Sequence, residues 1–394
     1  KCSMRIIYIH QYYLTPEQGG AIRSYHLSQG LTKVGVKVEL ITAHNKNQYI
    51  RRKDGEVIVH YLPVPYLSTY STRQRVMAFY DFYKKAKRLI KELAKPDLFY
   101  ISSTPLTTGW IGVWAKKKYG IPYVFEVRDL WPEAPVQVLK INNPFIRKFL
   151  YKMEAGIYRE ADKIVALSPG IQHYIKDLFP DKKIALIPNF SNNEFFNPNQ
   201  KKWNGRDFDK QPLRISYAGA IGKVNGLDNF LELAFVAQSL GKKWRFELMG
   251  SGNALSELKM KVSSLKLSNV IFVPFGDKNA VKAQLDKADF AYISFLPLKV
   301  LENSSPNKFF DALAMGLPVI VNFKGWIYNL IEIEKIGLFH PVEDHELLVE
   351  NIEHLRKNLD QYYQMSRNSR RIAETKFDKN FIQEKLHAFL GLKK

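Results

Sequence analysis

A regular alternation of short apolar segments with longer amphipathic segments constrains this chain more than any other feature of its sequence. In the first half, strand-like apolar segments fall at 4–9, 36–42, 57–62, 98–101, 123–127, 163–167 and 184–187. Helix-like segments, beginning with 21–34, separate most of them. Strands that alternate with helices favour a parallel, doubly wound α/β sheet.

The alternation stops over 191–212 and then begins again. This stretch is rich in asparagine, proline and glycine, so it predicts a linker with little to pack. Strand-like segments return at 213–218, 245–249, 270–273, 290–293 and 317–321. We therefore predict two Rossmann-like domains facing a cleft, at 1–190 and 213–372, with a final segment at 373–394.

The charge of the chain points to an anionic partner. Its 59 lysines and arginines against 38 acidic residues give a formal net charge of +21, which suits phosphates, nucleic acid or an acidic membrane. Basic residues are interleaved with aromatic ones over 66–95, and a second basic stretch covers 147–152. Helices of this kind lie on anionic lipid, although solvated helix faces with inward-facing aromatics give the same pattern.

Composition disfavours several other functions. The single cysteine, Cys2, excludes a disulfide within the chain and a cysteine-rich metal site. The longest uncharged run, 98–115, contains enough polar residues to predict a strand and a helix start rather than a membrane span. Because no apolar stretch of the signal-peptide kind lies near Met4, we expect a cytoplasmic protein.

Ligands of open α/β sheets bind at the carboxyl ends of the strands, so the loops there supply the candidate site residues. One such loop holds Gly19 and Gly20, and another holds Arg128, Asp129 and Glu133. The glycines let the backbone approach a ligand closely. An arginine beside two carboxylates can bind a polyol or hold a proton, and a plain turn or a surface ion-pair cluster is the alternative.

The second half of the chain carries a similar set of loops. Gly219 and Lys223 lie in a glycine-containing loop that can wrap a phosphate, although its spacing matches neither the Walker motif nor the dinucleotide fingerprint. Gly250 and Gly252 follow the next strand and form either a turn or a nucleotide contact. Gly276 and Asp277, which follow the third strand and Phe275, are the candidates for stacking or hydrogen-bonding with a base.

The segment 302–321 predicts a loop that leads into a helix and then a buried strand. Asn303, Ser304 and Ser305 are helix-capping residue types, and Pro306 suits a first turn. Free backbone N–H groups and the helix dipole attract anions to such a position, and Lys308 adds a positive charge. We predict a diphosphate site here, with an ordinary capped helix as the alternative.

Six motifs, taken in order, resemble a known family. They are IHQYYLTPEQGGAIRSYHL at 9–27, YVFEVRDLWPE at 123–133, IPNF at 187–190, YAGAIGKVNGLDNFLELA at 217–234, ELMGSG at 247–252 and SSPNKFFDALAMGLPVIV at 304–321. Together they resemble the retaining glycosyltransferases of family 4, which have the GT-B fold. The resemblance extends to a branch of bacterial surface-polysaccharide enzymes related to N-acetylfucosamine transferases.

This resemblance implies a retaining enzyme that transfers a sugar, such as an N-acetylated aminosugar, from a nucleotide-sugar donor. We expect a UDP-linked donor, no obligatory metal or other cofactor, and a polyprenyl-diphosphate-linked acceptor in O-antigen or capsule synthesis. The enzyme would work at the anionic cytoplasmic face of the inner membrane, and its final helix, at 377–392, would return to the first domain. The implied catalytic residues are Arg128, Asp129, Glu133 and Lys308. The implied donor-binding residues are Gly19, Gly20, Gly219, Lys223, Gly250, Gly252, Phe275, Asn303, Ser304, Ser305 and Asp311.

The chain departs from the family pattern at five positions. Asp311 occupies the place of the second of two signature glutamates, the one that contacts the ribose, and Asn303 occupies the place of the first. Ala220 and Asn225 stand where an arginine and a lysine commonly neutralise the diphosphate, so Lys223 or Lys308 is the candidate replacement. Arg128 stands where many relatives have a histidine.

Two other readings remain open at this point. A basic protein with interleaved aromatics can bind single-stranded nucleic acid, although no nucleic-acid module is present and the glycine loops would then have no role. A GT-B protein can also act as an epimerase, or as a phosphorylase, which needs a pyridoxal-phosphate lysine.

Overall fold

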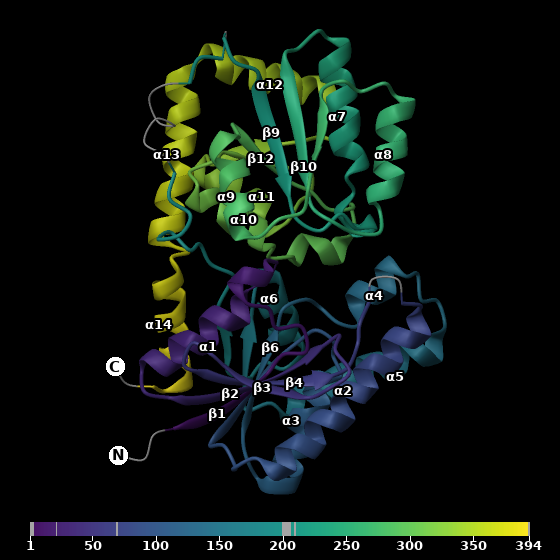
Figure 1. Ribbon diagram of the computed structural model, residues 1–394, viewed down its shortest axis with the longest axis vertical. Coiled ribbons are helices and arrows are strands. Elements are labelled where there is room, and N and C mark those ends of the chain that lie inside the picture. Colours follow the sequence, from purple (N-terminus) through teal and green to yellow (C-terminus); the bar gives the residue numbers. More distant parts are fainter. Residues whose placement is uncertain (1–3, 21, 68–69, 199–205, 209, 393–394) are drawn as a thin grey trace.

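The structure is a computed structural model that describes residues 4–20, 22–67, 70–198, 206–208 and 210–392, and it contains two α/β domains joined along one edge (Figure 1). Several positions used above lie outside the described residues. These are Cys2, Ala21 at the predicted start of a helix, and the linker positions 199–205 and 209.

The N-terminal domain is built on an eight-stranded sheet with the order β3-β4-β2-β1-β5-β6-β7-β8. The pairing is parallel except for β3, which runs antiparallel to β4 at one edge. The strands are β1 (Arg5–Ile9), β2 (Lys37–His44), β3 (Ile50–Asp54), β4 (Val57–Pro63), β5 (Leu98–Ser102), β6 (Tyr123–Val127), β7 (Lys163–Ala166) and β8 (Ile184–Leu186).

The C-terminal domain is built on a six-stranded parallel sheet with the order β11-β10-β9-β12-β13-β14. In both sheets the strand order reverses direction beside the first strand of the domain, which is where open α/β sheets bind ligands. The strands are β9 (Leu213–Ala218), β10 (Trp244–Met249), β11 (Val270–Val273), β12 (Phe290–Ile293), β13 (Val319–Val321) and β14 (Gly337–Phe339).

Helices connect the strands and cover both sheets. In the N-terminal domain they are α1 (Arg23–Lys33), α2 (Thr72–Glu92), α3 (Thr108–Tyr119), α4 (Glu133–Val138), α5 (Pro144–Glu160) and α6 (Pro169–Leu178), with the 3₁₀ turn η1 (Pro16–Gln18). In the C-terminal domain they are α7 (Asp228–Ser239), α8 (Leu255–Ser264), α9 (Lys278–Lys287), α10 (Asn307–Ala314), α11 (Trp326–Glu334), α12 (His345–Lys357) and α13 (Leu359–Thr375), with η3 (Lys223–Asn225) and η4 (Lys299–Asn303).

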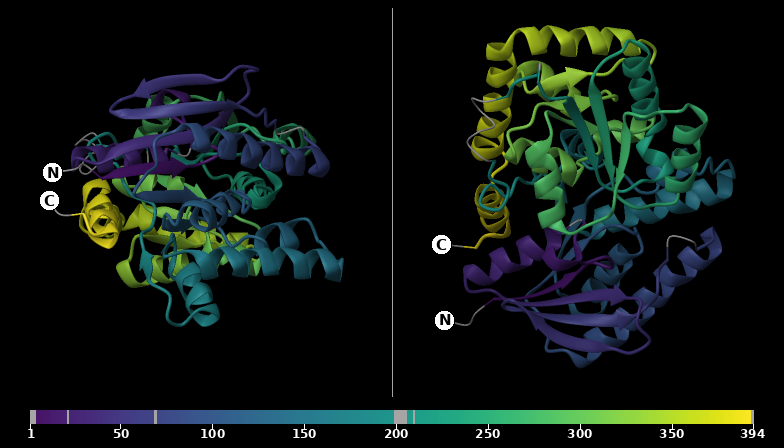
Figure 2. Two further views of the ribbon diagram at one scale, coloured as in Figure 1. Left: turned by 90° about the horizontal axis from the view of Figure 1, so that it is seen from below. Right: turned by 45° about the horizontal axis from the view of Figure 1, so that its top comes forward.

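The chain crosses between the domains twice, and the two crossings lie side by side. The first runs through Ser191, and the second runs from α13 into the last helix, α14 (Lys379–Leu390). Ser191 N donates to Phe377 O at 2.7 Å and Lys379 N donates to Ser191 O at 3.0 Å. Figure 1 and the right-hand view of Figure 2 show α13 and α14, in yellow, along one edge of the molecule, where α14 packs on α1.

These observations confirm the predicted fold class, two parallel-sheet α/β domains. The predicted helix capping before α10 is wrong: Pro306 is the N-cap residue, and no side chain caps the helix. Ser304 and Ser305 instead lie in the extended loop before it, where the Ser304 carbonyl accepts a hydrogen bond from the Trp326 indole at 2.8 Å.

Candidate active site

A cavity of about 400 Å³ opens at the carboxyl ends of the C-terminal strands. Gly219 after β9, Gly250 after β10 and Phe275 after β11 contribute to its wall, and Lys308 and Asp311 of α10 complete it. Gly20 of the N-terminal domain also lines it, so the cavity lies between the two domains. Further lining residues, which were not predicted, are Ala218, Met249, Ser251, Lys278, Val281, Phe295, Pro306 and Asn307.

Close backbone packing explains two of the predicted glycines. A Cβ atom on Gly250 would lie 1.9 Å from the Gly219 carbonyl oxygen, and one on Gly252 would lie 2.2 Å from the Ile221 carbonyl oxygen. The loops after β9 and β10 therefore touch through their backbones, which requires glycine. Of the two, Gly250 lines the cavity, whereas Gly252 does not.

Lys308 presents a half-buried amine to this cavity. Its Nζ donates to the Tyr217 hydroxyl at 2.6 Å and lies 4.1 Å from the centre of the Tyr217 ring. Among the described residues, no carboxylate forms an ion pair with it. Burial therefore lowers the pKa of Lys308 to about 7, and an anion in the cavity would be its missing partner.

Asp311, the candidate for ribose binding, lies in the same wall and is 8% exposed. Its Oδ2 atom accepts a hydrogen bond from Lys278 Nζ at 2.7 Å. Ala220 and Asn225, which replace the basic residues of the family pattern, also line the cavity. A Cβ atom on Gly219, next to Ala220, would lie 3.5 Å from Lys308 Nζ, so this amine can supply a positive charge there. Lys223 is exposed and does not line the cavity.

Asn303 and Ser304 lie outside this cavity. Together with Asp129 they line a separate small hollow of about 10 Å³ between the two domains. Asn303 fits against the start of α6, where a Cβ atom on Gly170 would lie 1.8 Å from its Oδ1 atom. Ser305 is buried, and its hydroxyl has no hydrogen-bond partner among the described residues.

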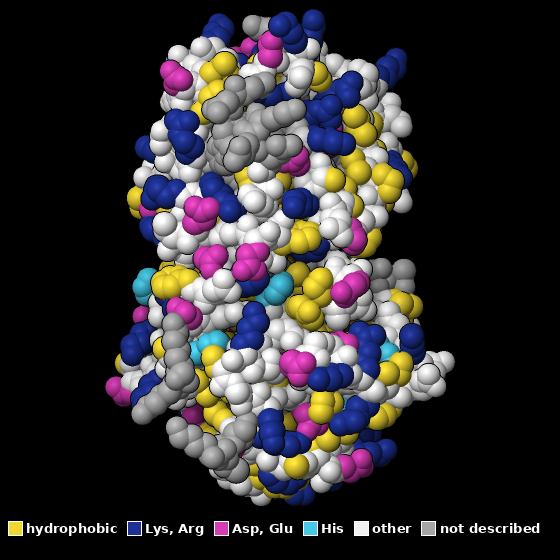
Figure 3. All heavy atoms as spheres, turned by 60° about the vertical axis from the view of Figure 1, so that its left-hand side comes forward, with side chains coloured by type: hydrophobic (Ala, Val, Ile, Leu, Met, Phe, Trp, Pro, Cys, Tyr) yellow, Lys and Arg dark blue, Asp and Glu magenta, His cyan; other side chains and the backbone are white. Residues whose placement is uncertain are grey.

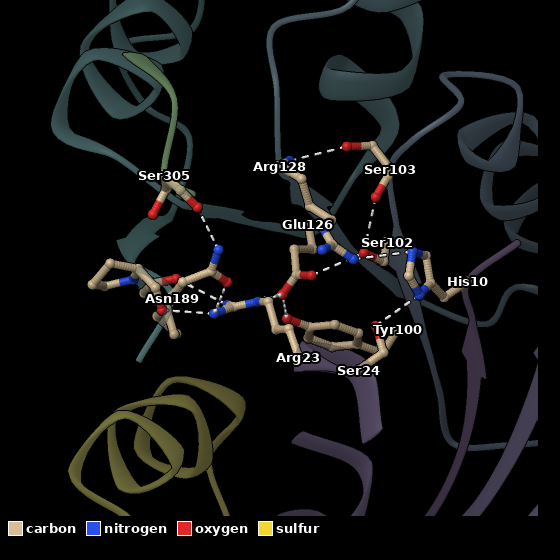
Figure 4. A network of polar contacts seen from close by, with 12 residues as sticks. His10, Arg23, Ser24, Tyr100, Ser102, Ser103, Glu126, Arg128, Asn189 and Ser305 are labelled. Carbon is tan, nitrogen blue, oxygen red and sulfur yellow. Dashed lines mark hydrogen bonds and ion pairs between the residues drawn. The ribbon is translucent and has the colours of Figure 1, made fainter. Parts of the chain in front are cut away.

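Arg128 makes its side-chain contact within the N-terminal domain. Its guanidinium donates to His10 Nε2 at 3.0 Å (Figure 4). Burial, aided by the Arg128 charge, lowers the pKa of His10 well below its usual value, so the imidazole is neutral. Since Nε2 accepts, Nδ1 carries the proton and donates to the Ser24 hydroxyl at 2.9 Å. Arg128 is thus held in place by a single histidine tautomer.

A buried ion pair lies directly beside this contact. Arg23 and Glu126 have fully buried side chains 3.0 Å apart. Burial alone would raise the pKa of Glu126, but the nearby charges of Arg23 and Arg128 hold it below its usual range. Arg23 also donates to the Pro188 carbonyl at 2.6 Å, and the side chain of Asn189 donates to the Ser305 carbonyl. This network joins the N-terminal core to the loop before α10 (Figure 4).

The remaining predicted residues have the following positions. Gly19 packs against the C-terminal domain, where a Cβ atom on it would lie 3.6 Å from Asp277 Cα. Asp129 is exposed as a whole residue. Desolvation of its carboxyl group raises the pKa of that group. Glu133 accepts hydrogen bonds from Gln137 and from the Tyr151 hydroxyl. The structure thus brings Gly20, Gly219, Gly250, Phe275, Lys308 and Asp311 together and leaves the other predicted residues around that group.

Sequence reasoning missed His10, Arg23, Glu126, Asn189 and Lys278. A signal existed for Glu126, because a carboxylate in the middle of a buried apolar strand requires a partner. Lys278 follows a strand end directly after a residue that was singled out, Asp277. No sequence pattern linked Arg23 to Glu126, which are 103 positions apart.

Two features are absent from the described residues. No helix there is long and apolar enough to cross a membrane. No group of three or more histidine, cysteine, aspartate or glutamate side chains in that part of the chain could hold a metal ion.

Comparison with known families defines the class of protein. A glycosyl transferase 4-like domain matches residues 18–189, and a domain of the glycosyl transferases group 1 matches residues 199–372. Between them these two domains account for most of the chain, which therefore belongs to the family 4 glycosyltransferases with the GT-B fold.

Curated relatives point to polysaccharide synthesis. The chain is 25% identical over 182 residues to WcaL of Escherichia coli (strain K12), a protein named for colanic acid biosynthesis; the match covers 45% of each chain. It is also 25% identical over 190 residues to the amylovoran biosynthesis glycosyltransferase AmsK of Erwinia amylovora, covering 47% of this chain and 46% of that one. The match thus spans about half the length of each relative.

Solved structures agree in fold. Sucrose-phosphate synthase from Thermosynechococcus elongatus has a TM-score of 0.76 at 17% identity, with 98% of each chain covered. Anabaena HepE in complex with UDP-glucose has a TM-score of 0.68 at 14% identity, covering 98% of this chain and 99% of that one. WaaG, a glycosyltransferase of lipopolysaccharide biosynthesis, has a TM-score of 0.67 at 16% identity, covering 98% and 99%.

Proposed function

We propose that this chain transfers a sugar, with retention of configuration, from a UDP-linked donor to a lipid-linked saccharide in the synthesis of a bacterial surface polysaccharide. The sugar we favour is an N-acetylated aminosugar, and the reaction needs no metal. The observation that carries the proposal is the cavity between the domains, whose half-buried Lys308 amine has no acidic partner among the described residues.

A nucleotide-sugar fits the chemistry of this cavity. Its volume of about 400 Å³ falls in the usual range for small-molecule sites. The diphosphate would lie near Lys308 and the start of α10, where backbone N–H groups add to the positive potential. Phe275, which is 59% exposed, offers a ring on which a base can stack. The complexes of HepE with UDP and UDP-glucose support this class of donor.

The proposed reaction is a front-face substitution. The acceptor oxygen forms a bond to the anomeric carbon while the bond from that carbon to the diphosphate oxygen breaks, and the proton of the acceptor passes to the departing phosphate. Protonated Lys308 stabilises the negative charge that builds on the diphosphate. Asp129 and Glu133 orient the acceptor, and Arg128, fixed by His10, contacts it from the N-terminal side.

The acceptor side of the proposal rests on the surface of the N-terminal domain. Phe145, Ile146 and Phe149 of α5 are 82%, 48% and 59% exposed, and exposed Arg147 and Lys148 lie between them. Exposed aromatic residues mixed with basic ones suit an anionic lipid surface. Other basic side chains are spread over both domains on the face that Figure 3 shows, which fits a protein attracted to anions in general.

Calorimetry with UDP, GDP, ADP and CMP tests the donor site, first in EDTA and then with magnesium. We expect UDP to bind in both conditions. Lys308→Met should weaken UDP binding by at least about tenfold, because a charge-assisted contact to phosphate is lost. Lys223→Met is the matched control, since Lys223 lies outside the cavity, and it should change the affinity little.

Two results would contradict this assignment. If none of the four nucleotides binds at millimolar concentration, the chain has no nucleotide-sugar site of the proposed kind. If Lys223→Met and Lys308→Met weaken binding equally, the diphosphate does not lie beside α10.

A further inference from the structure

An ion pair forms part of the wall of the candidate donor cavity. Lys278, at the start of α9, and Asp311, on α10, are joined by a hydrogen bond of 2.7 Å, and both side chains are 11% exposed. Both residues line the donor cavity, and both also line a second cavity of about 240 Å³ on the side of the first domain crossing. The ion pair therefore lies between two cavities and is largely shielded from bulk solvent.

Local helix chemistry does not explain a lysine at this position. Lys278 is the first residue of α9, which Asp277 caps by accepting a hydrogen bond from Ala280 N at 3.0 Å. The positive end of a helix repels an ammonium group. What holds Lys278 is the Asp311 carboxylate, together with the ring of Phe196, whose centre lies 5.5 Å from Nζ.

Both members of the pair keep hydrogen-bonding capacity. An ammonium group donates three hydrogen bonds, and the described residues accept one from Lys278. Asp311 Oδ2 accepts that bond, whereas Oδ1 has no hydrogen bond to the described residues. The cavity wall thus presents a donor and an acceptor side by side, at a place largely screened from water.

We propose that Lys278 is a donor-binding residue that completes, with Asp311, a site for the vicinal diol of the donor ribose. Each hydroxyl of a diol both donates and accepts, so one can donate to Asp311 Oδ1 while its neighbour accepts from Lys278 Nζ. Because a buried partner left without its hydrogen bond is costly, such a site discriminates against an analogue that lacks one hydroxyl. This inference rests on the proposed nucleotide-sugar function.

The test compares the binding of UDP with that of 2′-deoxy-UDP and 3′-deoxy-UDP by calorimetry. The unmodified protein should prefer UDP over at least one deoxy analogue by about tenfold, the value of one hydrogen bond to a charged group. Lys278→Met keeps the apolar stem and removes the donor, so the preference should fall below about threefold. Lys278→Arg keeps the donor and should keep the preference.

Lys282→Met is the matched control, because Lys282 lies one turn further along α9 and does not line the donor cavity. It should leave both affinity and preference unchanged. The melting temperature of each variant separates unfolding from a specific effect, and a purely structural tie between α9 and α10 would lower stability without changing the preference for ribose. If Lys278→Met keeps the full preference, the inference is wrong. If the unmodified protein binds no nucleotide, the proposed function fails instead.

Discussion

At the scale of single residues, Lys308 links donor binding to pH. Without an anion, burial lowers its pKa to about 7, and a bound diphosphate would raise that pKa again. Binding therefore takes up a proton above about pH 7, and UDP affinity should fall as the pH rises from about 7 to about 9. Calorimetry in buffers of different ionisation enthalpy measures the number of protons that are taken up when UDP binds.

The control for this prediction is Lys308→Arg, because arginine stays charged throughout that range. The variant should bind UDP with little dependence on pH. A pH dependence that is the same in the variant and in the unmodified protein would assign the proton to another group.

The sequence predicted which loops meet, but it did not predict which side chains pair with each other. The strand-end loops led to Gly20, Gly219, Gly250 and Phe275, which line one cavity in the structure, because parallel strands bring their carboxyl ends together. The contact between Lys278 and Asp311 could not be predicted in this way. This contact depends on how α9 and α10 pack. The alternation of apolar and polar segments does not specify the distance between two helices.

At the scale of secondary-structure elements, α5 supports a prediction about lipid binding. The double variant Phe145→Ser/Phe149→Ser removes two exposed aromatic rings and keeps Arg147 and Lys148. Since each buried aromatic side chain contributes on the order of 2 kcal/mol, binding to vesicles of anionic lipid should weaken by at least about tenfold. Co-sedimentation with vesicles measures this.

The matched control is Met260→Ser/Ile333→Ser, which removes two apolar side chains that are 66% and 76% exposed on the C-terminal domain. It should leave vesicle binding unchanged. Equal binding by both double variants and the unmodified protein would exclude α5 as the lipid contact.

The elements themselves could largely be predicted, with informative exceptions. Buried strands such as β6 and β9 were placed at their observed bounds because both faces of a parallel strand are covered and most of their residues are apolar. β3 was missed because it is an edge strand with the sequence IRRKD, most of whose side chains are exposed. β14 has three residues and no usable pattern. The capping prediction at Ser304 failed because tertiary contacts hold that loop extended.

At the scale of the whole molecule, the packing of α14 on α1 ties the end of the described chain to the N-terminal domain. A Cβ atom on Gly30 of α1 would lie 2.7 Å from Gln383 Cδ, and Gln383 donates to the His26 carbonyl at 2.7 Å. Gly30→Leu should therefore loosen α14, lower the rate of sugar transfer and leave UDP affinity within about threefold, because most of the donor cavity belongs to the other domain. Steady-state kinetics and calorimetry measure the two effects.

Gly156→Leu on α5 is the control, since a Cβ atom there has no neighbour within 4 Å. It should leave both quantities close to those of the unmodified protein. A loss of UDP affinity in Gly30→Leu as large as its loss of rate would show that α14 supports the donor site itself.

The backbone hydrogen bonds between Ser191 and the segment Phe377–Lys379 fix more than a local contact. Two neighbouring connections form a hinge. They allow the domains to rotate about one axis, and they oppose twisting of one domain against the other. Displacement then grows with distance from these two connections. Figure 1 shows α4 on the opposite side of the molecule from α13 and α14, so α4 and η4, which contact each other across the domains, would separate most when the molecule opens. A pair of spectroscopic labels on α4 and η4 would report opening as an increase in the distance between them. The distance between two labels beside Ser191 would stay constant.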